Sequence, residues 1–118
     1  MTEPKPNRGE VWRVMFGPKK GAEIQKVRPA AVISVKGVGR LPLRIVVPIT
    51  DWKKEYADYP WFVHLRVTPT NGLTKESGAD AFQVKSVSVE RFMTKLGVLH
   101  DGEMESIAAA ISLCVGYQ

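Results

Sequence analysis

The chain has 118 residues, the length of one domain, and its 44% hydrophobic and 25% charged residues are typical of a globular protein. This composition argues against disorder over most of the chain, and no apolar run has the length of a transmembrane helix. The polar, Pro-rich start lacks the apolar stretch of a secretory signal, and the single cysteine fits a reducing compartment. We therefore expect a cytoplasmic protein without a membrane association.

Charge is distributed unevenly along the chain. The 17 Lys and Arg residues outnumber the 12 Asp and Glu residues, which gives a net charge of +5. All the cations lie between Lys5 and Lys95, whereas the segment after them carries only acidic charges. A basic body of this kind indicates a polyanionic partner, although solubility alone explains the charge of many basic proteins. One cysteine and two distant histidines do not make a zinc site, so we expect no metal and no cofactor.

Residues 1–8 are predicted to form a flexible arm, and residues 9–118 a single domain. Within the domain, short apolar runs between turn signals predict strands at 10–16, 29–35, 43–49, 61–67, 79–87 and 92–98. A short helical turn is expected within 51–58. In the run 61–67, period-two alternation places Val63 and Leu65 on one face, and Phe62 and His64 on the other.

The last segment has helical spacing instead. Asp101 is expected to cap this helix, and Gly116 to end it. Its apolar face is predicted to contain Met104, Ile107, Ala108, Ile111 and Val115. The chain is therefore predicted to be mainly β, a small barrel closed by one C-terminal amphipathic helix.

A polar loop at 21–29 leads directly into a predicted buried strand, with Arg28 at the junction. Pro29 biases Arg28 toward extended backbone, so a rigid strand can aim its planar guanidinium at a phosphate. The alternative is that Arg28 forms a structural salt bridge with an acid.

The next buried strand ends in Thr50, Asp51 and Trp52. The hydroxyl of Thr50 can donate to a phosphate oxygen, or it can cap the following turn. The indole of Trp52 can stack on a nucleobase, or it can cover the core.

A third polar segment, residues 75–86, contains Ser77 and leads to Gln83 and Lys85. Gln83 can read base edges and Lys85 can meet a phosphate, whereas the alternative is a solvated loop and strand. His64 and His100 raise the question of a histidine-based ribonuclease, but nothing in the sequence brings them together.

In their order and spacing, these segments resemble the MazF/PemK family of toxin–antitoxin toxins. The matching pieces within residues 8–116 are 8–12, 21–23, 28–34, 46–50, 72–73, 83–86 and 96–97, followed by the amphipathic C-terminal segment. The resemblance implies a small SH3-like barrel of the CcdB/Kid/MazF type with a terminal helix, working as a homodimer. It also implies a sequence-specific, metal-independent endoribonuclease that cuts single-stranded RNA and is neutralised by a cognate antitoxin.

By motif, Arg28 matches the arginine that serves the scissile phosphate, and Thr50 matches the threonine that completes the catalytic site. Glu23 matches the acid after the loop glycine and is the candidate general base. The residues expected to bind RNA are Gln83, Lys85, Trp52, Lys19, Lys20 and Ser77. Many members carry Asp directly before the glutamine, where this chain has Phe82. Asp80 is expected to share a strand face with Phe82, which is no basis for transferring the role.

The expected reaction is attack of the RNA 2′-hydroxyl on the adjacent phosphorus, which leaves a 2′,3′-cyclic phosphate and a 5′-hydroxyl. Arg28 would stabilise the added charge on the phosphorane oxygens. Two other readings use the same fold: a CcdB-like toxin that poisons DNA gyrase, and an SH3-like RNA-binding module without chemistry. Loss of Arg28 should abolish the ribonuclease, spare the gyrase poison and only weaken the binding module.

Overall fold

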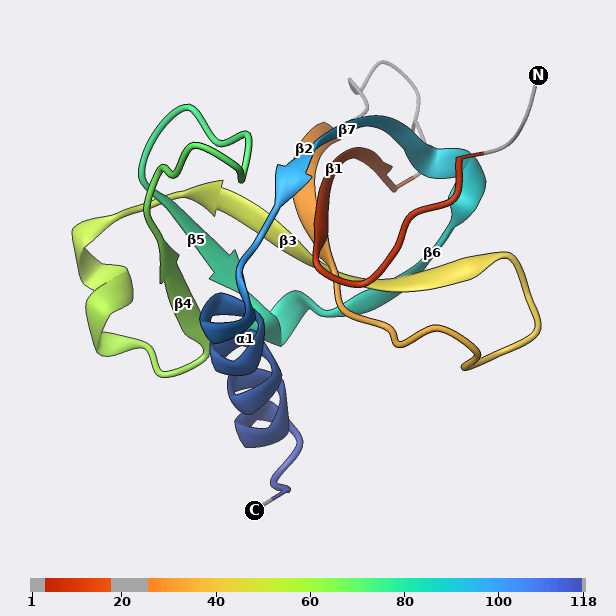
Figure 1. Cartoon of the computed structure of the whole chain (residues 1–118). Coiled ribbons are helices and arrows are strands. Elements are labelled where there is room, and N and C mark those ends of the chain that lie inside the picture. The colour runs from red at the N-terminus through yellow and green to blue at the C-terminus, as the bar shows by residue number, and fades with distance from the viewer. Residues whose placement is uncertain (1–3, 18–25, 118) are drawn as a thin grey trace.

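The computed structural model describes residues 4–17 and 26–117. Within them, the chain forms seven strands, three short 3-10 helices and one α-helix (Figure 1). The strands are β1 (Glu10–Phe16), β2 (Lys26–Val32), β3 (Leu43–Asp51), β4 (Phe62–Leu65), β5 (Ser77–Asp80), β6 (Lys85–Ser88) and β7 (Phe92–Val98). The helices are η1 (Lys54–Asp58), η2 (Ala81–Gln83), η3 (Val89–Arg91) and α1 (Asp101–Cys114).

The strands form one antiparallel sheet in the order β4-β5-β3-β2-β1-β7, and β6 also pairs with β3. One edge of β3 pairs with β2, whereas the other edge is divided between two partners. The first half of that edge pairs with β6, from Leu43 to Val46, and the second half with β5, from Ile49 to Asp51. In Figure 1, β3 runs as a long strand through both halves of the molecule. The η2 turn joins β5 to β6 beside this divided edge.

Residues 30–32 of β2 and 46–47 of β3 are buried on both faces, because a hydrophobic core lies on each side. The helix-side core packs Ala31, Val47 and Ile49 against Met104 and Ile107 of α1. The second core contains Val14, Ala30, Val32, Val46, Val87, Val89 and Phe92. Side chains alternate along a strand, so adjacent residues of β2 and β3 contribute to opposite cores.

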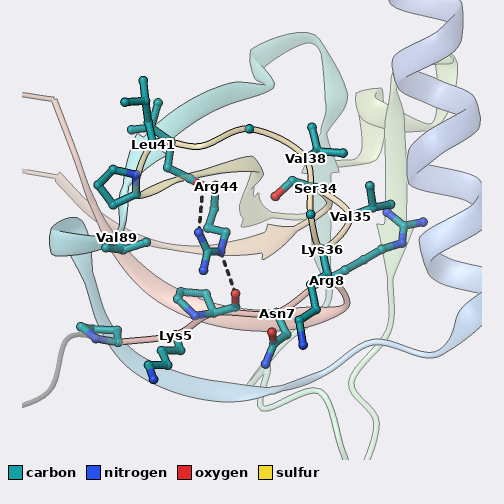
Figure 2. A pocket seen from close by; sticks show the side chains of 16 residues that line it. Lys5, Asn7, Arg8, Ser34, Val35, Lys36, Val38, Leu41, Arg44 and Val89 are labelled. Atoms are coloured by element: carbon teal, nitrogen blue, oxygen red, sulfur yellow. Dashed lines mark hydrogen bonds between the residues drawn. The ribbon is translucent and has the colours of Figure 1, made fainter.

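Residues 4–8 of the predicted arm lie against the loop between β2 and β3. Pro6 is fully buried, and its carbonyl accepts a hydrogen bond from Nε of Arg44 at 2.8 Å. Arg8 donates to the carbonyl of Ile33. This segment, most of the loop between β2 and β3, and the start of β3 line a hollow of about 750 Å³ (Figure 2). Of the predicted site residues that the structure describes, none lines it.

The strands predicted at 10–16, 43–49 and 92–98 are confirmed. The strand predicted at 29–35 lies three residues earlier, because its pairing with β1 begins at Phe16 and Lys26. The continuous strand predicted at 79–87 is wrong in its middle, where η2 interrupts it. The expected turn within 51–58 is η1, and Val63 and Leu65 pack in the helix-side core as predicted.

Helix α1 begins at Asp101, but the capping residue is His100 rather than the predicted Asp101. Nδ1 of His100 accepts from the Glu103 amide at 3.2 Å, and the Glu103 carboxylate accepts from the His100 amide at 3.1 Å. This reciprocal pair is a capping box, which satisfies two backbone donors at the helix start.

The buried positions of α1 are Met104, Ile107 and Ala110. The predicted apolar face is therefore wrong at Ala108 and Val115, which are exposed. Gly116 follows the helix with a φ of +74°, the conformation expected of a C-terminal stop. Within the described residues, no helix has the length and apolar character needed to cross a membrane.

Glu10 fastens the start of β1. Its Oε1 accepts from the Asn7 amide at 2.8 Å and from Nε1 of Trp12 at 2.9 Å, and its Oε2 lies 3.1 Å from Nζ of Lys95. Partial burial opposes ionisation of Glu10, but the contacts with Trp12, Asn7 and Lys95 together outweigh it and lower the pKa of Glu10 below its ordinary value.

A lowered pKa means that the unfolded state binds more protons than the folded state at acidic pH. The stabilising contribution of Glu10 is therefore present above its unfolded pKa of 4.5 and is lost as the pH falls through the lower folded pKa. We expect Glu10→Gln to destabilise the fold at pH 7 and to flatten the acidic part of the stability profile. Urea unfolding at a series of pH values measures this, and a wild-type slope in the variant would contradict it.

Asn71 holds the loop between β4 and β5. It is fully buried, its Nδ2 donates to the Arg66 carbonyl at 2.8 Å, and its Oδ1 accepts from the Leu73 amide at 3.0 Å. Asn71→Ala leaves both backbone groups without partners, so we expect the free energy of unfolding to fall by roughly 2–4 kcal/mol. Urea unfolding measures the loss. The exposed Thr74→Ala is the control, expected to stay within about 0.5 kcal/mol of wild type.

Candidate active-site cleft

Arg28 and Thr50 lie together across two paired strands. The register of β2 and β3 pairs Ala30 with Pro48, and its continuation by two residues sets Arg28 opposite Thr50. Nη1 of Arg28 donates to Oγ1 of Thr50 at 3.4 Å, and both residues are half-buried. A guanidinium has five N–H donors, and this contact uses one of them. Within the described residues Arg28 forms no ion pair, so the salt-bridge alternative has no partner there.

Arg28 and Thr50 line a cleft of about 370 Å³. Strands β1, β2 and β3 contribute Phe16, Lys26, Arg28, Pro48 and Thr50. The segment after β3 contributes Lys53, Tyr56 and Phe62, and the run from β5 to β6 contributes Asp80, Gln83 and Lys85. The cleft therefore unites four of the predicted site residues: Arg28, Thr50, Gln83 and Lys85.

The cleft opens where the second core ends. Because side chains alternate along strands, Arg28 lies on the face of β2 that carries Ala30, and Thr50 on the face of β3 that carries Val46. Phe16 both packs against this core and lines the cleft. Arg28 and Thr50 are thus carried by strands that are anchored by buried side chains immediately beside them.

The lining of the cleft is strongly basic. Among the lining residues that the structure describes, four are cations, Lys26, Arg28, Lys53 and Lys85, and one is a carboxylate, Asp80. None of the four forms an ion pair within the described part of the chain. Such a cleft attracts a polyanion, and its positive charge is concentrated around Arg28.

The η2 turn places Asp80 and Gln83 on one face. A 3-10 helix has three residues per turn, so side chains at i and i+3 eclipse. Nε2 of Gln83 donates to Oδ2 of Asp80 at 2.9 Å, while the Phe82 amide donates to Oδ1 at 3.2 Å. The expectation that Asp80 shares a face with Phe82 is therefore wrong, because it assumed a continuous strand. Asp80 shares the face of Gln83 instead.

Trp52 and Ser77 do not line the cleft. Trp52 stacks on His64, with ring centroids 4.2 Å apart, and covers Gly78, where an added Cβ would lie 3.0 Å from its ring. Ser77 is buried, and its hydroxyl donates to the Lys75 carbonyl at 2.8 Å. The structure therefore does not bring these two residues to Arg28.

Glu23, Lys19 and Lys20 lie outside the described residues. The histidines have separate acidic neighbours: His64 lies 3.2 Å from Glu76, and His100 lies 3.3 Å from Glu103. In residues 4–17 and 26–117, no group of three or more His, Cys, Asp or Glu side chains is placed to hold a metal ion.

The sequence reasoning missed several cleft residues: Phe16, Lys26, Lys53, Tyr56, Phe62 and Asp80. Lys26 lies two residues before Arg28, so strand alternation would have placed both on one face had β2 been predicted to begin at 26. Lys53 and Tyr56 carry no such signal, because their position depends on how η1 folds back over β4.

Comparison with known proteins gives a consistent result. Residues 7–115 match the family described as PemK-like, MazF-like toxin of type II toxin–antitoxin system. Endoribonuclease MazF9 of Mycobacterium tuberculosis is 32% identical over 112 residues, which cover 90% of this chain and 92% of the relative.

Solved structures show the same fold. An endoribonuclease in complex with its cognate antitoxin from Mycobacterial species has a TM-score of 0.75 at 19% identity, covering 97% of this chain and 98% of that one. A MazE–MazF structure from Deinococcus radiodurans has a TM-score of 0.73 at 23% identity, covering 96% and 97%. The predicted fold class, mainly β with a barrel-like sheet and one C-terminal helix, is confirmed.

Proposed function

This chain belongs to the PemK-like, MazF-like toxin family of type II toxin–antitoxin systems, and on that premise we propose that it is a sequence-specific endoribonuclease acting on single-stranded RNA. The observation that carries the proposal is the contact of Arg28 with Thr50 in a cleft whose described lining has four cations and one carboxylate. A relative 32% identical over most of the chain bears the name endoribonuclease. The gyrase-poison alternative is not favoured, because the family match is to PemK and MazF toxins.

The proposed reaction uses the RNA's own 2′-hydroxyl as nucleophile. Its oxygen attacks the adjacent phosphorus, the bond to the 5′-oxygen of the next nucleotide breaks, and a 2′,3′-cyclic phosphate and a 5′-hydroxyl result. Negative charge builds up on the non-bridging oxygens, where one preorganised donor contributes about 3 kcal/mol. We assign that role to Arg28. Thr50 accepts one guanidinium N–H and so orients Arg28, while its own hydroxyl hydrogen remains available to a phosphate oxygen.

A base takes the proton of the 2′-hydroxyl, and the leaving 5′-oxygen takes up a proton from a protonated group or from water. Glu23 stays the predicted base, on the strength of its position in the motif. Asp80 is the one carboxylate among the described lining residues, and it holds the amide of Gln83 at 2.9 Å. We assign Asp80 to positioning Gln83, whose remaining amide groups can read a base edge. Lys26, Lys53 and Lys85, with the predicted Lys19 and Lys20, attract the RNA backbone in a salt-sensitive manner.

The charge that develops on the phosphate is met by Arg28 and the lysines, so the proposed scheme requires no metal or cofactor. We propose that the working unit is a homodimer in the cytoplasm, where RNA is the substrate. A cognate antitoxin is the proposed inhibitor, as solved relatives include complexes with antitoxin.

Incubation of the protein with a long single-stranded RNA in EDTA tests this proposal. We expect discrete cuts at a common sequence. Arg28→Ala should lower kcat by roughly 10²- to 10³-fold, because it removes a donor at the developing oxyanion. Arg40→Ala is the matched control, since Arg40 is exposed in the loop before β3 and does not line the cleft.

Three results would contradict the proposal. If the Arg28→Ala variant is folded and cuts RNA at the wild-type rate, Arg28 has no role in the chemistry. Cutting that stops in EDTA and returns with a divalent cation would replace the metal-independent scheme. RNA binding without any cutting would favour the RNA-binding module.

A further inference from the structure

We propose that Phe82, backed by Trp61 and Tyr59, is a stacking platform for an unpaired base of the RNA bound in the cleft. This inference rests on the proposed function and extends it, because it names residues that would decide which nucleotide is accepted beside the cleaved phosphate. The platform lies outside the residues carried over by motif.

The η2 turn leaves Phe82 pointing into solvent. Asp80 and Gln83 occupy the face toward the cleft, while Ala81 is buried and Val84 packs on the helix-side core. A 3-10 helix has three residues per turn, so its side chains point in three directions. The remaining direction faces solvent, and Phe82, which points there, is 72% exposed. A large apolar ring is thus held in water directly between two residues that line the cleft.

Phe82 ends a row of aromatic rings that leads back to the cleft wall. Trp61 lies 6.5 Å from Phe82 between ring centroids and stacks on Tyr59 at 4.9 Å, with an interplanar angle of 3°. Tyr59 contacts Phe62, which stacks on Tyr56 at 3.9 Å. Tyr56 and Phe62 line the cleft beside Lys53. The row is therefore continuous from Phe82 to the wall of the cleft that holds Arg28.

These rings lie on the surface and are not part of a hydrophobic core. The η1 turn contains no buried residue, and Tyr59, directly after it, is itself 37% exposed. Mutual stacking instead fixes the rings in place, which lowers the entropic cost of presenting Phe82 to a ligand.

A nucleobase fits this surface better than a protein side chain, because the row is continuous with a cleft lined by four cations. Aromatic rings next to a basic groove are the usual means of binding single-stranded nucleic acid, with bases on the rings and phosphates on the cations. Loss of one stacking ring typically weakens binding by about 5- to 150-fold.

The test measures binding separately from cleavage. The ligand is a 2′-O-methyl RNA spanning the strongest cut, or a random-sequence 2′-O-methyl pool if no cut is found, with affinity read by fluorescence anisotropy. We expect Phe82→Ala to weaken binding by about 5- to 150-fold, Phe82→Leu to resemble it, and Phe82→Trp to bind at least as well as wild type. The control is Tyr117→Ala, an aromatic residue 75% exposed after α1.

An abasic scan identifies the stacked base. Each nucleotide near the cut is replaced in turn by an abasic one. One of these replacements should weaken RNA binding by the wild type but leave the RNA affinity of Phe82→Ala unchanged. That non-additivity is specific to a direct contact, because a merely structural effect of Phe82 would add to every abasic loss.

Three results would overturn the platform. The first is that Phe82→Ala binds RNA as tightly as wild type. The second is that Phe82→Leu binds RNA as tightly as wild type although it lacks a ring. The third is that a Phe82 variant keeps its RNA affinity but loses self-association or antitoxin binding. The last would make this surface a protein interface. Intact cleavage together with any of these leaves the proposed function standing. Phe82-dependent binding without cutting would keep the platform and remove the nuclease, and no RNA binding by wild type would remove both.

Discussion

The position of the cleft follows from one constraint, the need of β3 to pair its backbone with three neighbours. Buried backbone groups must be hydrogen-bonded, and β3 meets this requirement with β2 on one edge and with β6 and then β5 on the other. Pro48, which has no amide hydrogen to donate, lies at the change of partner. The chain between β5 and β6 turns there as η2, so Asp80 and Gln83 arrive beside Thr50. The site is thus a consequence of how the sheet divides.

The two cores on either side of β2 and β3 then hold Arg28 and Thr50 in place. The helix-side core holds one face of β2 and β3, and the second core holds the face that carries Arg28 and Thr50. A donor that must meet a developing charge is most effective when it needs no rearrangement, and paired strands between two cores supply that condition. The proposed stacking platform has a different structural basis. Phe82 and the aromatic row depend on short 3-10 turns, which can vary without disturbing the sheet.

Much of this arrangement was predictable from local sequence pattern. Short apolar runs between turn signals located β1, β3 and β7, and motif spacing located Arg28, Thr50, Gln83 and Lys85 in what proved to be one cleft. The η2 turn was not predictable by alternation, because the Asp80 carboxylate accepts a hydrogen bond from the Phe82 amide and this local bond competes with the strand. Trp52, which lies between β3 and η1, stacks on His64 of β4, and this contact depends on tertiary packing.

The central claim is that the 2′-hydroxyl of the RNA attacks its own phosphate under the control of Arg28. The most direct measurement replaces the single ribonucleotide before the mapped cut by its 2′-deoxy form and compares binding and cleavage with the unmodified RNA. The account predicts unchanged binding, no cleavage at that phosphate, and 2′,3′-cyclic phosphate and 5′-hydroxyl ends on the unmodified RNA. Cleavage of the deoxy substrate, or 5′-phosphate ends, would show that water attacks instead and would contradict the account.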